Sequence, residues 1–249
     1  MTYCVGMALK DGLVMVSDSR TNAGVDQISV FRKLTTWEVP GERVISLCTA
    51  GNLAVTQAVV DMVSKGIILD DEDEPVSMMT VGGMRDAARL VGKALRQIEK
   101  QDGEVLRQQG VEVNSVFLLG GQVKGGRMSL FHIYAAGNFI ESTEQTPFFQ
   151  IGETKYGKPI LDRVVDYDLG LDDAVKLALI SMDSTLRSNI SVGPPLDVLT
   201  VRRDALTVEM RRVIEEDDLY LKDIQKRWGR ALRSAFKRIP PMPPEGEAL

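Results

Sequence analysis

Thr2 is the residue whose position offers the most chemistry, because it lies at the start of the chain and directly before an apolar segment. The initiator methionine is commonly removed before a small residue such as threonine, and removal would leave Thr2 with a free α-amine. An α-amine has an unperturbed pKa of about 7.7–8.0, so it can accept a proton near neutral pH. A threonine that carries both groups is a nucleophile with its own general base.

Two charged residues could tune this nucleophile. Asp18 follows the apolar segment at 13–17, and Lys33 precedes the segment at 34–39. A nearby cation keeps an amine neutral and makes a hydroxyl more acidic, and a carboxylate beside the lysine would orient it. Alternatively, Asp18 and Lys33 form a surface ion pair that contributes little to stability.

The position of Asp18 depends on the turn between the first two strands. A three-residue turn at 10–12 pairs Cys4 with Asp18 and places Thr2 and Asp18 diagonally on one face, about 7–8 Å apart. A two-residue turn at 11–12 moves Asp18 to the other face. The sequence does not choose between the two turns, so the site hypothesis includes a prediction of register, the three-residue turn.

The composition excludes several classes of protein. The chain has 249 residues and a net charge of −5, with two cysteines, Cys4 and Cys48, and one histidine, His132. This argues against a disulfide framework, a Cys/His zinc site and a nucleic-acid binder, and no metal or cofactor is expected. No apolar run reaches the eighteen or so residues of a membrane span, and the N-terminus lacks a basic signal region. We expect a cytoplasmic protein whose single histidine is an ordinary sheet residue.

The order of the predicted elements favours one fold class. Alternating apolar residues predict strands at 3–9, 13–17, 34–39, 43–49, 113–119, 127–134, 147–151, 196–202 and 206–213. Three- and four-residue periodicity predicts helices at 52–65, 79–101, 154–166, 171–188 and 217–238. Two antiparallel sheets with helix pairs in two batches indicate an α+β fold, a four-layer α-β-β-α sandwich. We expect one domain over 1–213, followed at 214–249 by an amphipathic helix and a proline-rich tail for contacts between subunits.

Four motifs in order carry a family resemblance. Thr2, Ser17-Asp18-Ser19-Arg20, Arg32-Lys33-Leu34 and Thr49-Ala50-Gly51 resemble the pattern of proteasome β-subunits. The longer segments TYCVGM, SDSRTNAGVDQISVFRK, TWEVPGERV and TAGNLAVTQAV are similar to those of the bacterial proteasome-type proteases called Anbu. The resemblance runs to about residue 213 and implies a sandwich of the Ntn-hydrolase type with N-terminal threonine peptidase chemistry.

The resemblance also implies roles for individual residues. Thr2 would be the nucleophile and, through its amine, the base, while Lys33 lowers the pKa of the site and Asp18 orients Lys33. The backbone N–H of Gly51 would donate to the oxyanion, a type of contact often worth several kcal/mol in the transition state.

Three further residues would bind substrate if the resemblance holds. Arg20 would brace its loop, and Thr21 would pair with an extended peptide through its backbone. Thr49 would line the pocket for the side chain that precedes the cleaved bond.

The chain departs from the proteasome pattern at two places. Glu153, in Gly152-Glu153-Thr154, stands where a helper serine is usual. It could relay protons, or it could hold the amine cationic and weaken it as a base. In the segment where the family pattern is D-x-x-S, Asn189 occupies the position of the aspartate, and Ser191 matches the serine only with an offset of one residue.

The last predicted helix has an apolar stripe on a basic background. Ile224, Trp228, Leu232 and Phe236 recur every four residues. Residues 222–238 hold seven Lys or Arg and one Asp, so their net charge is +6 and the rest of the chain carries −11. Docking on a neighbouring subunit is favoured over a membrane surface, because the body of the chain is acidic.

These features lead to one main expectation and two alternatives. The main one is a self-compartmentalising threonine peptidase that cleaves peptides or unfolded proteins and assembles from identical subunits, as a ring or an open helix. The alternatives are an amidase of the same fold acting on small amides, and a weakly active or idle assembly subunit. Idle proteasome-type subunits usually carry an N-terminal extension, and its absence here favours the enzyme.

Overall fold

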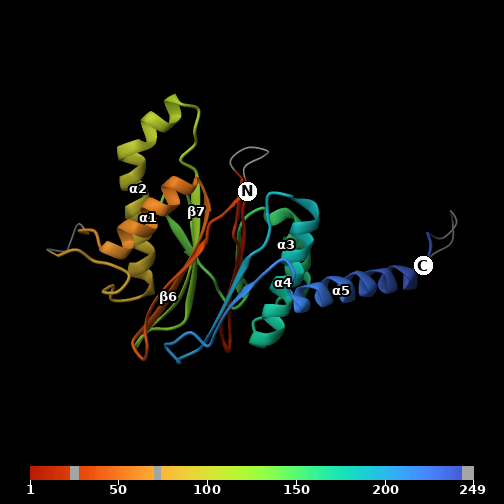
Figure 1. Ribbon diagram of the computed structural model, residues 1–249. Helices are drawn as coiled ribbons and strands as arrows, with labels where there is room; N and C mark the ends of the chain where they lie inside the picture. Colours follow the sequence, from red (N-terminus) through yellow and green to blue (C-terminus); the bar gives the residue numbers. More distant parts are fainter. Residues whose placement is uncertain (23–27, 70–73, 243–249) are drawn as a thin grey trace.

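The computed structural model describes residues 1–22, 28–69 and 74–242 (Figure 1). The end of the predicted proline-rich tail, from residue 243, lies outside these described residues.

The first sheet contains the strand that begins next to Thr2. Its five strands are arranged in the order β10-β1-β2-β11-β12, and every neighbouring pair is antiparallel. The strands are β1 (Tyr3–Leu9), β2 (Gly12–Asp18), β10 (Phe148–Gly152), β11 (Leu196–Arg202) and β12 (Met210–Ile214). The N-terminal strand therefore lies inside the sheet, with a partner on each side, and does not fray as an edge would.

The second sheet has five antiparallel strands in the order β5-β6-β7-β8-β9. These are β5 (Leu34–Val39), β6 (Arg43–Gly51), β7 (Ser115–Val123), β8 (Ser129–Ile133) and β9 (Phe139–Glu141). A separate two-stranded ribbon, β3 (Arg20–Asn22) and β4 (Ile28–Val30), lies between the two sheets in the sequence.

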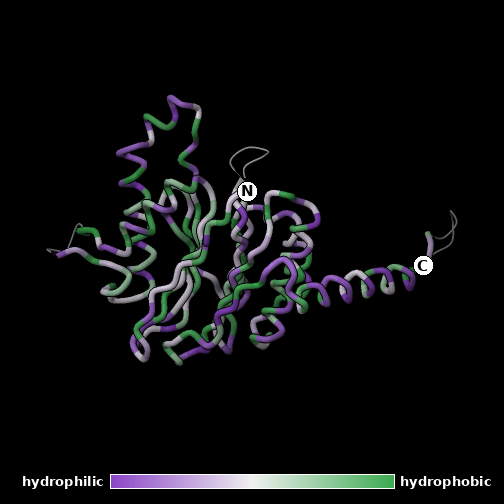
Figure 2. The backbone as a smooth tube through the Cα atoms, in the orientation of Figure 1, coloured by the Kyte–Doolittle hydropathy of each residue, from purple (hydrophilic) through white to green (hydrophobic). Residues whose placement is uncertain are grey.

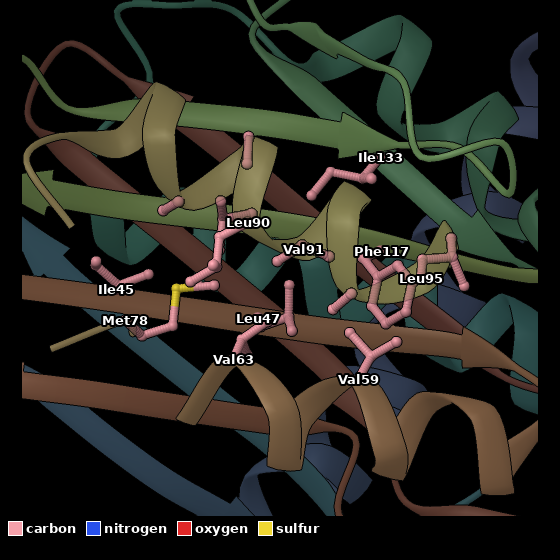
Figure 3. Packing of buried hydrophobic residues seen from close by; sticks show 14 of the residues in the cluster. Ile45, Leu47, Val59, Val63, Met78, Leu90, Val91, Leu95, Phe117 and Ile133 are labelled. Atoms are coloured by element: carbon pink, nitrogen blue, oxygen red, sulfur yellow. The ribbon is translucent and has the colours of Figure 1, made fainter. Parts of the chain in front are cut away.

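Helices cover the outer faces of both sheets. Figure 1 shows α1 (Leu53–Lys65) and α2 (Met84–Gln108) on one side, and α3 (Thr154–Val164) and α4 (Leu171–Ser188) on the other. Three apolar clusters fill the spaces between these layers. In the cluster of Figure 3, side chains such as Val59 and Leu90 from the helices pack on Leu47 and Phe117 of β6 and β7. The predicted four-layer α-β-β-α sandwich is confirmed.

Several elements differ from their predicted limits. The short strands β3, β4 and β9 carry no alternating pattern long enough to be predicted. Gly120 and Gly121 lie inside β7, although the sequence indicates a turn there. A Cβ at Gly121 would lie 2.1 Å from the carbonyl oxygen of Val44, so these glycines serve close strand packing.

The predicted register of the first hairpin is wrong. Leu9 pairs with Gly12 and Cys4 pairs with Ser17, so the turn has two residues, 10 and 11. Gly12 belongs to β2 because its backbone (φ 154°) runs so close to β11 that a Cβ would lie 2.1 Å from the oxygen of Val201. Asp18 therefore lies beside the start of β1, and the predicted diagonal arrangement of Thr2 and Asp18 on neighbouring strands does not form.

The last helix, α5 (Leu219–Arg238), projects away from the sandwich (Figure 1). Only its first turns join the core, through Leu221 and Ile224, which pack with the cluster under α3 and α4. Beyond them Leu232 and Phe236 are exposed, and Figure 2 shows hydrophobic and hydrophilic residues alternating along the projecting part. Among the described residues, no helix combines the length and the apolar composition that crossing a bilayer requires.

Two helical glycines allow a matched test of the packing between α3 and the first sheet. A Cβ at Gly157 would lie 2.2 Å from the hydroxyl of Tyr3 and 2.3 Å from that of Ser181, whereas the nearest atom at Gly229 is 3.6 Å away. We expect Gly157→Ala to lower the free energy of unfolding by about 1–3 kcal/mol. Gly229→Ala should raise it, by up to about 1 kcal/mol, because alanine favours the helix. Urea denaturation of both variants checks this, and equal effects would contradict it.

Candidate active site

Thr2 is held at the upper end of the sandwich by the strand next to it. It is 9% exposed, and its carbonyl oxygen accepts a hydrogen bond of 2.7 Å from the N–H of Glu153. Gly152 approaches this carbonyl so closely, with φ at 83°, that a Cβ would lie 1.9 Å from the oxygen. Only glycine fits there, so β10 determines where the chain start lies.

Asp18 is a fully buried carboxylate at the end of β2. Its Oδ1 accepts hydrogen bonds from the N–H of Tyr3 at 3.0 Å and from Nζ of Lys33 at 2.8 Å. Its Oδ2 accepts from the N–H of Gly193 at 3.3 Å. Burial raises the pKa of Asp18 above its ordinary value, and Lys33 and the two N–H donors oppose that rise.

Lys33 is 5% exposed and lies directly before β5, the first strand of the second sheet, whereas Asp18 belongs to the first sheet. Besides Asp18, its ammonium donates to the carbonyl oxygen of Arg20 at 2.6 Å. Its own carbonyl accepts from the N–H of Thr49 at 3.0 Å, which ties its backbone to β6. The pair Asp18–Lys33 is therefore a salt bridge between the two sheets, and a buried pair of this kind tolerates poorly the loss of one partner.

Thr2 and Lys33 line a pocket of about 510 Å³, whereas the predicted site residue Asp18 is not part of its lining. Six residues predicted from the sequence line it, namely Thr2, Thr21, Lys33, Thr49, Gly51 and Glu153. The remaining lining comes from Met1, Ala50, Leu53, Thr56 and Gly152. The sequence hypothesis that Thr2 and Lys33 share one site is thus consistent with the positions of their side chains.

The junction of β6 and α1 forms a further part of the lining. Gly51 has φ at 118°, and a Cβ there would lie 2.1 Å from the carbonyl oxygen of Asn114. Asn52 then caps α1, because its side chain accepts from the N–H groups of Ala54 and Val55. This turn presents exposed backbone at Gly51 to the pocket.

Glu153 lies at the N-cap position of α3, and its side chain is 12% exposed. Its Oε2 makes no hydrogen bond among the described residues, and it lies 3.4 Å from Nζ of Lys155. A buried carboxylate oxygen that has only this loose ion pair is able to take a further donor or a cation.

Asn189 and Ser191 lie outside the lining of this pocket. Asn189 is the C-cap of α4, and its side chain accepts from the N–H of Ser191 at 2.9 Å. The loop they form contacts the site at Gly193, which donates to Asp18. Arg20 braces the same loop, since its Nη1 donates to the carbonyl oxygen of Ile190 at 3.1 Å.

Sequence reasoning missed the backbone groups that complete the site. The N–H groups of Tyr3 and Gly193 and the carbonyl of Arg20 hold Asp18 and Lys33, and backbone contacts of this kind leave no signature in residue type. Leu53 and Thr56 of α1 were also missed, although their position one turn after the Thr49-Ala50-Gly51 motif is a usable signal.

The described residues contain no group of three or more His, Cys, Asp or Glu side chains that could hold a metal ion. His132 is half-buried in β8, where its ring packs against Tyr134 and Phe149, and burial lowers its pKa. Cys4 and Cys48 are free and fully buried.

Comparisons with known proteins agree on one family. The family model described as proteasome subunit matches residues 2–201. An Anbu (Gly-1) mutant from Hyphomicrobium sp. strain MC1 is 48% identical, with a TM-score of 0.89, and the match covers 98% of this chain and all of that one.

Two further solved structures are similar over nearly their whole length. Anbu from Yersinia bercovieri, described as an ancestral beta-subunit, is 50% identical with a TM-score of 0.88, covering 97% of this chain and 99% of that chain. The helical assembly of the Anbu complex from Pseudomonas aeruginosa is 44% identical with a TM-score of 0.89, covering 98% and 100%. No curated protein gives a significant match.

The buried salt bridge can be tested against an exposed one of almost the same length. Lys33→Ala should lower the free energy of unfolding by about 3–5 kcal/mol, because Asp18 stays buried without its cation. Lys10→Ala removes the exposed Lys10–Asp168 pair of 2.9 Å and should leave stability almost unchanged.

The deficit of Lys33→Ala should shrink as the pH falls through the raised pKa of Asp18, since a protonated carboxyl needs no cation. Chemical denaturation at several pH values measures both effects. Equal losses for the two lysine variants would contradict the account.

Proposed function

The chain belongs to the proteasome subunit family, and from this membership we propose that it is a peptidase whose nucleophile is Thr2. The observation that carries the proposal is the shared pocket of Thr2 and Lys33, with Lys33 held by the buried Asp18. A hydroxyl next to a fixed ammonium is more acidic than a free one, and a neighbouring amine stays neutral more easily.

The proposed reaction requires that Met1 has been removed. While Met1 is present it lines the pocket, and the nitrogen of Thr2 is an amide that cannot act as a base. Once it is removed, the α-amine takes the proton of Oγ1, and Oγ1 attacks the carbonyl carbon of the substrate. In this proposal Gly51, which lines the pocket, donates its backbone N–H to the oxyanion that forms.

Collapse of the tetrahedral intermediate leaves an ester on Thr2. The α-ammonium gives its proton to the departing amine, so the first peptide product leaves neutral. The same amine then takes a proton from a water molecule that attacks the ester. The bond between the acyl carbon and Oγ1 breaks, Oγ1 takes the proton back from the α-ammonium, and the acid product departs. No atom outside the chain, the substrate and water is needed for this balance.

The substrate class follows from the elements around the pocket. Thr21 belongs to the short strand β3 and lines the pocket, so an extended peptide could add to β3 as a further strand. Thr49 and Leu53 also line the pocket, and in this proposal they contact the side chain that precedes the cleaved bond. We infer that extended peptides or unfolded segments are the substrates.

Glu153, Asn189 and Ser191 have more distant roles in this proposal. Glu153 is the ionisable lining residue that contacts the Thr2 backbone, so it sets the charge next to the amine. Asn189 and Ser191 shape the loop whose Gly193 N–H holds Asp18. In this proposal they act on the nucleophile through Asp18.

Assembly from identical subunits is the second part of the proposal. A similar chain, 44% identical, is described as forming a helical assembly. The apolar stripe on the projecting part of α5 supports such an arm, because exposed side chains of this size favour burial against a partner. We propose that 214–249 is the arm and 1–213 is the catalytic body. A cytoplasmic location stays a prediction.

An idle assembly subunit is the candidate function that competes with this one. Retention of Met1 in the natural protein would favour it, because an acylated Thr2 has no free amine. A small-amide amidase differs in substrate only, and a comparison of peptides of increasing length separates it from a peptidase.

Replacing the nucleophile tests the peptidase directly. With Met1 removed, as verified by intact mass, Thr2→Ala should lower peptide hydrolysis by about 10³-fold or more, whereas Thr2→Ser should keep part of it. The buried salt bridge is unaffected by both changes, so their melting temperatures should stay close to that of the parent. Hydrolysis that survives in Thr2→Ala would refute the assignment, and no hydrolysis by the Met1-free parent would favour the idle subunit.

The arm is tested by a pair of glutamate substitutions on α5. Phe236→Glu places a charge in the apolar stripe and should shift the assembly to smaller species. Ser234→Glu adds the same charge on the opposite side of the helix and should leave the assembly intact. Analytical ultracentrifugation measures both, and identical size distributions would contradict the role of the stripe.

A further inference from the structure

A second buried carboxylate, Asp197, lies beside the catalytic pair and has no role in the reaction described so far. It is in β11, its side chain is 3% exposed, and it pairs across the sheet with Ser17 of β2. Cross-strand partners point to the same face of a sheet, and Cys4, opposite Ser17 on the other side, lies in the apolar cluster between the sheets. Asp197 therefore faces the space between the two sheets.

The partners of Asp197 are the chain neighbours of the catalytic pair. Its Oδ1 lies 3.8 Å from Nη1 of Arg32, the residue before Lys33. Its Oδ2 accepts a hydrogen bond of 3.4 Å from the hydroxyl of Ser19, the residue after Asp18. The two salt bridges thus involve adjacent residues, Arg32 and Lys33, and the hydrogen bond from Ser19 connects Asp197 to the residue after Asp18.

Among the groups around Asp197, Arg32 contributes most to stabilising its negative charge. Its Oδ1 makes no hydrogen bond among the described residues, and the same holds for the hydroxyl of Ser17 beside it. Arg211 of β12 acts on it only through longer-range attraction. Burial raises the pKa of Asp197, and Arg32 opposes that rise more than Arg211 does.

We propose that Asp197 is a positioning residue for Lys33, which holds the segment of Arg32 and Lys33 through its ion pair and the end of β2 through Ser19. The inference rests on the proposed function, because Lys33 matters only if Thr2 is the nucleophile. Lysine has a long flexible side chain, so its ammonium stays in place only if the backbone that carries it is fixed. Asp197 also balances the positive charge of Arg32 near the site.

This balance predicts opposite changes in the pKa of the Thr2 α-amine. Asp197→Asn removes a negative charge and leaves Arg32 uncompensated, which disfavours the ammonium form, so the pKa of the amine falls. Arg32→Gln removes the positive charge and leaves Asp197 uncompensated, so the pKa rises. The double variant should lie between the two. A residue that only supports the fold would not move this pKa in opposite directions.

The test uses the full chain with Thr2 as the first residue, obtained by cleaving a leader that ends before it. Carbon-13 shifts of labelled Thr2 against pH give the pKa of the amine without any need for turnover. Asp183→Asn is the matched control, because Asp183 is equally buried and paired with an arginine, but on α4. It should leave the pKa of the amine unchanged.

Kinetics provide the second measurement. Asp197→Asn should lower kcat for peptide hydrolysis several-fold and leave KM nearly unchanged, while Asp197→Glu should restore part of the loss. Arg32 is 58% exposed, so Arg32→Gln is expected to fold. Its effect on the pKa of the amine can therefore be measured even if Asp197→Asn does not fold.

The outcomes separate this inference from the proposed function. An unchanged pKa of the amine in Arg32→Gln would overturn the inference and leave the role of Thr2 intact. Opposite shifts in the two variants would support it even if the parent proved unable to hydrolyse peptides, a result that would count against the proposed function alone.

Discussion

The rest of this structure depends on a salt bridge buried between two sheets. Asp18 from one sheet and Lys33 from the start of the other meet at 2.8 Å with almost no solvent exposure. Taking two charges out of water is unfavourable unless both find close partners, and here the N–H groups of Tyr3 and Gly193 and the carbonyl of Arg20 supply them. Any shift of one sheet against the other would break this set, so the salt bridge restricts how the sheets can pack.

The chain start is fixed by the same constraint. The N–H of Tyr3 donates to Asp18, and the carbonyl of Thr2 accepts from Glu153, so both polar groups of the Thr2–Tyr3 peptide bond are held. Thr2 is thereby brought to one pocket with Lys33, although 31 residues separate them in the sequence. Asp197 and Arg32, the residue before Lys33, form a second ion pair, which is longer and has one exposed partner. Two neighbouring ion pairs therefore lie where the two sheets meet at the site.

Residue types predicted the layers and part of the site, because the apolar periodicity of helices and strands, and the Gly and Pro residues at turns, depend on local sequence. The helix pairs, the two sheets and a shared site of Thr2 and Lys33 were predicted in this way, whereas the place of Gly51 at this pocket was implied by the family resemblance. The hairpin register was not, since it depends on how closely Gly12 approaches β11, which lies about 190 residues away in the chain. Gly193 was missed for a similar reason, because its contribution is a backbone N–H. Sequence patterns carry no record of contacts made by peptide groups.

The central claim is that the first residue of the mature chain is the nucleophile and that Lys33 makes it reactive. Covalent labelling tests this most directly, with an acylating peptide electrophile applied to the Met1-free protein and the adduct located by mass spectrometry. The account predicts one adduct, on Thr2, formed far more slowly when Lys33 is replaced by methionine in protein that is still folded. Labelling at another residue, or labelling of Thr2 at the same rate without the lysine, would contradict it.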